Sequence, residues 1–72
     1  MLSNIEAERV RNRMSKEDLA GDLGVSLKTY YNWVSEETDI PGSALVKLKE
    51  IFHKDIDYLM EGSIHAGRTT AS

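Results

Sequence analysis

The chain has 72 residues, enough for one small domain, and carries a formal net charge of −3 at pH 7. It contains no cysteine, which excludes a disulfide framework and a thiolate metal site. No apolar run approaches membrane-spanning length, and the first residues lack the basic-then-apolar order of a signal peptide. We therefore expect a cytoplasmic protein with no membrane partner.

The first two predicted helices are short and are separated by a capping signal. Residues 4–13 form the first helix, and residues 16–23 form the second, with an apolar stripe at helical spacing. Ser15 is a candidate N-cap for the second helix, and Asp18 is its partner in a capping box. Gly24 follows this helix, where a C-terminus needs a residue that tolerates positive φ.

The third predicted helix, residues 27–35, has two different faces. Ser26 is its candidate N-cap. Tyr30 and Trp33 share one side, and such large aromatic residues are expected to fill the core between helices. The opposite side, which should face outward, carries Leu27, Lys28, Tyr31 and Asn32.

The rest of the chain provides two more predicted helices and a tail. Residues 42–52 have apolar residues at helical spacing and should be core, and residues 55–61 form a short fifth helix that seals it. Residues 62–72 are small and polar without periodicity, so we expect a disordered tail after a domain at 1–61.

The segment from Lys16 to Trp33 resembles the helix-turn-helix of the phage lambda repressor and Cro type, the Xre-like family. The positions that carry the resemblance are Lys16, Leu19, Ala20, Gly24, Val25, Tyr30 and Trp33. The similarity extends over most of residues 4–61. It implies an all-α, five-helix, lambda-repressor-like DNA-binding domain with the helix-turn-helix at its second and third helices.

By this resemblance, Leu27, Lys28 and Asn32 occupy the positions that read bases. Lys28 can donate to guanine O6 or N7, and Asn32 can pair with adenine N6 and N7. Leu27 can lie against a thymine methyl group. The alternatives are that Lys28 and Asn32 are plain surface residues, and that Leu27 belongs to a protein interface.

Four other residues are candidates for contacts with DNA phosphates. Lys16 opens the second helix, where backbone N–H groups and the helix dipole also favour an anion. Thr29 and Tyr31 can each use a hydroxyl group, and Arg13 lies on the polar face of the first helix. Simple solvation is the alternative for Arg13, and a protein interface is the alternative for Tyr31.

Two features depart from the family pattern. Glu36, Glu37 and Asp39 place three acids in a loop that often carries basic residues in this family. Arg9 stands where such repressors often pair an arginine with an acid near the end of the third helix, but Val34 occupies the partner position. Glu36 or Glu37 is the expected substitute partner for Arg9.

Two functions fit these observations. The first is a sequence-specific regulator of transcription, a repressor, that binds double-stranded DNA as a homodimer with Tyr58 and Met60 at the dimer contact. Those two residues could instead only close the monomer core. The second function is a protein–protein interaction module on the same fold, which the acidic loop favours.

The sequence contains no catalytic constellation, so we do not expect an enzyme. His53 and His65 stand apart and are not expected to hold a metal. Neither a cofactor nor a small-molecule ligand is expected.

Overall fold

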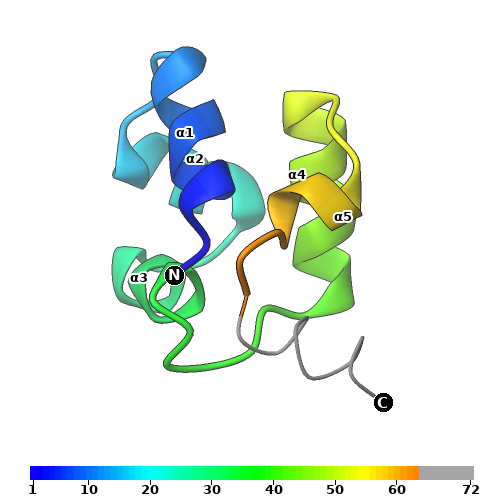
Figure 1. Ribbon diagram of the computed structural model, residues 1–72. Helices are drawn as coiled ribbons and strands as arrows, with labels where there is room; N and C mark the ends of the chain where they lie inside the picture. The colour runs from blue at the N-terminus through cyan, green and yellow to red at the C-terminus, as the bar shows by residue number, and fades with distance from the viewer. Residues whose placement is uncertain (64–72) are drawn as a thin grey trace.

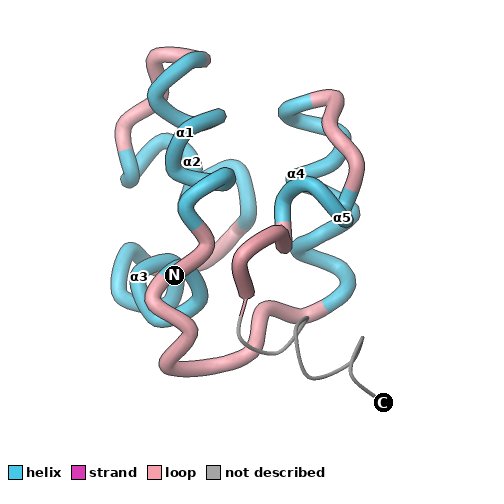
Figure 2. Tube along the Cα trace, viewed as in Figure 1, coloured by secondary structure: helices cyan, strands magenta, loops and turns pink. Residues whose placement is uncertain are grey.

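Five α-helices and no strand make up residues 1–63, the part of the chain that this computed structural model describes (Figure 1). The helices are α1 (Ser3–Arg11), α2 (Lys16–Leu23), α3 (Leu27–Val34), α4 (Gly42–Phe52) and α5 (Ile56–Leu59). Figure 2 shows a short loop between α2 and α3 and a longer one between α3 and α4. The all-helical fold that the sequence predicts is confirmed.

Local hydrogen bonds explain where α2 and α3 begin and end. The Ser15 hydroxyl accepts from the Asp18 N–H at 2.9 Å, and the Asp18 carboxylate accepts from the Ser15 N–H at 3.0 Å. This is the predicted capping box. Gly24 ends α2 with φ 73°, and the Ser26 hydroxyl then accepts from the Thr29 N–H at 3.2 Å to begin α3.

The core lies between two groups of helices. In the view of Figure 1, α1, α2 and α3 lie on one side, and α4 and α5 lie on the other. Helix α4 packs on α2 and α5 packs on α1, so the two groups close around one apolar interior. The buried residues of this core are Leu2, Ile5, Leu19, Ala20, Leu23, Tyr30, Trp33, Val34, Ala44, Leu48, Phe52 and Leu59.

Three helices are shorter than the sequence predicts, and α3 ends at Val34, one residue earlier than expected. Helix α1 ends at Arg11, and Arg13 has a φ of 57°, which a right-handed helix cannot include. Val10, which continued the predicted apolar pattern, is 62% exposed because it lies on the outer side of α1. Helix α5 covers only Ile56–Leu59, and Asp55 precedes it without a side-chain capping bond.

The start of the chain is bound to the end of α3. The buried Leu2 donates its N–H to the Val34 carbonyl at 2.9 Å. The Met1 amino group lies 2.8 Å from Glu36 Oε2, and the Ser63 hydroxyl donates to Glu36 Oε1 at 2.6 Å. Most of the segment for which we predict disorder, residues 64–72, lies outside the described residues.

Candidate nucleic-acid interface

Helix α3 has one face in the core and one face toward solvent. Tyr30 is 1% exposed, and Trp33 and Val34 are also buried. On the other side, Lys28 is exposed and Tyr31 is 46% exposed. The structure therefore has the orientation of α3 that the sequence predicts, with its aromatic pair Tyr30 and Trp33 directed inward.

The three candidate base-reading residues lie on the outward side of this helix. Lys28 is exposed, and Leu27 and Asn32 are half-buried, so the fold covers none of them completely. The Asn32 backbone carbonyl accepts a hydrogen bond from the Thr38 N–H at 3.2 Å. This bond uses the main chain, so the amide group of the Asn32 side chain is not consumed by it.

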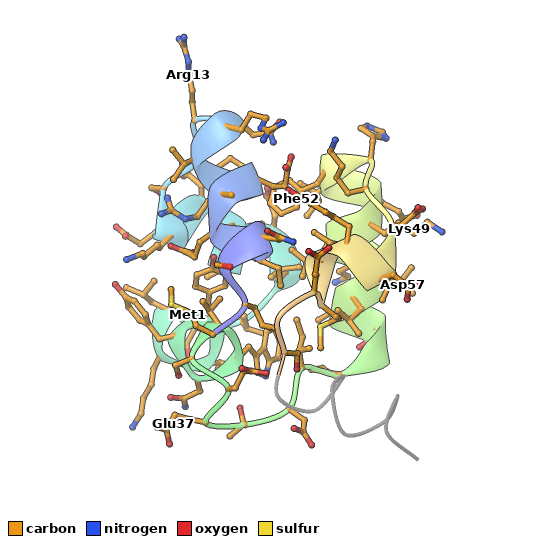
Figure 3. All side chains as sticks on the ribbon, viewed as in Figure 1. Met1, Arg13, Glu37, Lys49, Phe52 and Asp57 are labelled. Carbon is orange, nitrogen blue, oxygen red and sulfur yellow. The ribbon has the colours of Figure 1, made fainter. Side chains whose placement is uncertain are left out.

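The candidate phosphate-contacting residues fall into two places. Lys16, at the first position of α2, lies with its ammonium 4.9 Å from the centre of the Tyr31 ring on α3. Thr29 is half-buried, and its hydroxyl accepts from the Ser26 hydroxyl at 3.0 Å. Figure 3 shows Arg13 extending away from the far end of α1, so the structure does not gather it with the residues of α3.

A hydrogen-bonded network behind α3 fixes this helix to α1. Arg9 donates to both carboxylate oxygens of Glu6, from Nε at 3.1 Å and from Nη2 at 3.0 Å. The Tyr30 hydroxyl donates to Glu6 as well, and Arg9 Nη1 donates to the Met14 carbonyl at 2.6 Å. The network therefore joins α1, α3 and the loop that leads into α2.

This network corrects the predicted partner of Arg9. The acid that pairs with Arg9 is Glu6, one turn away on the same helix, and not Glu36 or Glu37. Glu36 is instead engaged by the Met1 amino group and by Ser63. The physical reason is that Glu6 also receives the Tyr30 hydroxyl, so an inward acid on α1 replaces one at the end of α3.

The environment of the network determines the protonation of its members. Burial alone would raise the pKa of Glu6, but hydrogen bonds from Arg9 and Tyr30, with the charges of Arg9 and Lys16, hold that pKa below its ordinary value. Burial and the hydrogen bond to Glu6 both raise the pKa of Tyr30. Glu6 therefore stays an anionic acceptor, and Tyr30 stays a neutral donor.

The buried acid Glu8 is absent from the residues that the sequence singles out. It is 1% exposed, and its Oε2 accepts from the Tyr58 hydroxyl at 2.9 Å and lies 3.6 Å from Arg11 Nη2. This bond to Glu8 raises the pKa of Tyr58. The helical spacing of Leu2, Ile5 and Glu8 was the available signal, because it places the acid on the buried side of α1.

The acids after α3 do not all face solvent. The side chain of Glu36 is only 6% exposed, because it turns inward to the start of the chain. Glu37 is exposed and points away from the body of the molecule (Figure 3). The negative charge next to α3 is therefore smaller at the surface than the sequence of this loop suggests.

Other candidate sites are also placed by the structure. Tyr58 and Met60, the predicted dimer contact, are half-buried and pack on the core. Within residues 1–63, no group of three or more histidine and acidic side chains is arranged to hold a metal ion. His65 lies outside the described residues. None of the described helices has both the length and the apolar character needed to cross a membrane.

Comparison with known proteins places the fold in a family. Neither the curated proteins nor the solved structures include a significant match to the chain. The helix-turn-helix family model matches residues 5–59, a range that includes α2 and α3 entirely and reaches from α1 to the end of α5. The chain therefore belongs to the helix-turn-helix family of the lambda repressor and Cro type, a DNA-binding family.

Proposed function

We propose that this protein is a transcriptional repressor that recognises a specific sequence in double-stranded DNA by inserting α3 into the major groove. The observation that carries this proposal is the orientation of α3 within a helix-turn-helix fold. Its aromatic face is buried, and Lys28 and Tyr31 remain exposed on the other face. The major groove is wide enough for a helix that presents such side chains.

We assign base recognition to three residues of α3. Lys28 donates to guanine, Asn32 pairs with the adenine edge, and Leu27 contacts a thymine methyl group. Each assignment is supported by the position of the residue on the partly or fully accessible side of the helix. A good bidentate contact discriminates between bases by about 1–3 kcal/mol, so Asn32 is the main source of specificity in this proposal.

We assign phosphate contacts to Lys16, Thr29 and Arg13, and we place Tyr31 beside the phosphate that Lys16 contacts. Lys16 and Tyr31 are supported by their mutual contact beside α3. Thr29 is half-buried in the first turn of α3, and its backbone N–H donates a hydrogen bond to the Ser26 hydroxyl. Arg13, at the end of α1, reaches only a phosphate that lies away from the base-reading residues (Figure 3).

The repressor would act as a homodimer in the cytoplasm, on an operator with two-fold symmetry. A dimer of such domains reads two half-sites about one helical turn apart. We place Tyr58 and Met60 at the contact, because both are only half-buried and retain accessible surface. Sedimentation equilibrium should show a concentration-dependent dimer, and a strict monomer on a two-fold DNA site would contradict this part.

Salt dependence of binding to generic duplex DNA tests the proposal. A protein that neutralises phosphates loses affinity with a slope of about −0.9 in log–log form for each phosphate contacted. We expect a slope of about −1.8 or steeper for each subunit, since Lys16 and Arg13 are the two charged side chains assigned to phosphates. A slope near zero, or no binding at low salt, would refute DNA binding.

The second candidate is a protein–protein interaction module that uses the same face of α3. It is favoured by the 46% exposure of the Tyr31 side chain, by half-buried Leu27 and by exposed Glu37. Aromatic residues of this kind are enriched at protein interfaces. The salt titration separates the two functions, because an interaction module has no reason to bind generic duplex DNA.

A further inference from the structure

One contact on the outward surface bridges the two helices of the motif. Lys16 begins α2 and Tyr31 lies in the middle of α3, and the Lys16 ammonium sits 4.9 Å from the centre of the Tyr31 ring. A cation at this distance from an aromatic face is attracted by the quadrupole of the ring. Because Tyr31 is 46% exposed, the contact lies at the surface that the proposed function turns toward DNA.

The contact restricts a side chain that would otherwise be mobile. A lysine has a flexible four-carbon stem and loses considerable rotamer entropy when it is fixed on a partner. Its ammonium has three donors, so a ring on one side leaves N–H groups available for an anion on another. The Glu6 carboxylate also attracts Lys16, but Glu6 already accepts from Arg9 and Tyr30.

We propose that Tyr31 is a positioning residue whose ring, rather than its hydroxyl, holds the Lys16 ammonium ready for a DNA phosphate. This inference rests on the proposed function and adds to it separate roles for one residue of α2 and one residue of α3. Lys16 provides the charge that meets the phosphate. Tyr31 reduces the entropy lost when that charge is fixed, so its effect on DNA binding passes through Lys16.

The first test measures binding to a short generic duplex over a series of salt concentrations. Tyr31→Phe keeps the ring and should bind as the parent does, whereas Tyr31→Leu should bind about two- to fivefold more weakly. Lys16→Ala should make the salt slope shallower by about 0.9. In the Lys16→Ala background, Tyr31→Leu should have no further effect, since the ammonium that the ring holds is gone.

Two results of this test would overturn the inference. If Tyr31→Phe is as weak as Tyr31→Leu, the hydroxyl contacts the phosphate and the ring has no positioning role. If Tyr31→Leu weakens DNA binding by the same factor with and without Lys16, the two residues act independently. Lys49→Ala is the matched control, because Lys49 is an exposed lysine on the opposite side of the molecule in Figure 3 and should leave the salt slope unchanged.

A second test needs no DNA and separates this inference from the proposed function. A ring above the Lys16 ammonium shifts the NMR signals of the neighbouring methylene protons upfield. The shift should be present in the parent and in Tyr31→Phe and absent in Tyr31→Leu. A parent that lacks this shift refutes the pairing, whereas a parent that shows the shift but binds no duplex refutes the proposed function instead.

Discussion

The network behind α3 predicts the effect of removing a single oxygen atom. Tyr30→Phe deletes the hydroxyl that donates to Glu6 and keeps the ring that fills the core. A hydrogen bond to a charged group contributes about 1.5–3 kcal/mol to stability. Tyr30 is 1% exposed and the Glu6 side chain is 18% exposed, so water can only partly replace the lost donor. We expect the variant to lose about 1.5–3 kcal/mol of unfolding free energy.

The same substitution should change how stability depends on pH. The pKa of Glu6 is lowered in the folded state, so its stabilisation is complete above the ordinary value of 4.5 and is lost as the pH falls through the folded-state value. In Tyr30→Phe this pKa moves back toward the ordinary value. The variant should therefore lose less additional stability than the parent between about pH 5 and pH 3.

Urea unfolding followed by tryptophan fluorescence measures both effects. Trp33 is the only tryptophan in the chain and is buried, so its emission reports unfolding directly. Tyr31→Phe is the matched control, because it removes a hydroxyl from an exposed tyrosine and should change stability by less than about 0.5 kcal/mol. The reasoning is refuted if Tyr30→Phe is as stable as the parent at pH 7. It is also refuted if the variant loses as much stability as the parent when the pH is lowered from about 5 to 3.

Three further substitutions and one control substitution test the fold. Trp33→Ala should cost about 3–5 kcal/mol in thermal unfolding, and a protein of parental stability would mean that the faces of α3 are reversed. Gly24→Ala should lower the free energy of unfolding by about 1–2 kcal/mol, because an alanine is strained at a φ of 73°. Gly21→Ala is the control: it lies inside α2, space for its methyl group is also open, and it should not destabilise the protein. Tyr58→Phe should lower the melting temperature, since buried Glu8 loses one hydrogen-bond donor, and an unchanged melting temperature would contradict that bond.

The parts of the structure that the sequence predicts depend on short-range chemistry. Ser15 and Asp18 form their capping box within one turn, and Gly24 takes the positive φ that ends α2. The two faces of α3 follow from helical periodicity, since Tyr30 and Trp33 are three residues apart and the charged Lys28 lies on the other side. Each of these features needs only neighbours within a few residues.

The hydrogen bonds that the sequence does not predict join residues that lie far apart in the chain. In the sequence, Glu6 and Glu8 both look like solvated charges. Their tyrosine partners, Tyr30 and Tyr58, lie on other helices. A sequence does not show that a tyrosine hydroxyl will be available on another helix. The pairing of Arg9 has a different cause, because its partner Glu6 lies only three residues away on the same helix. The family pattern predicts a partner near the end of α3, where Val34 carries no charge.

Selection of bound sequences from random duplexes tests the central claim most directly, when the parent is compared with Lys28→Ala and Asn32→Ala. We predict that the parent enriches a two-fold symmetric motif with half-sites about 10 base pairs apart. Each variant should remain folded and lose preference at one position of each half-site, while Lys49→Ala, an exposed lysine on α4, keeps the parental motif. No enriched motif for the parent, or the same motif for all four proteins, would contradict recognition of DNA by α3.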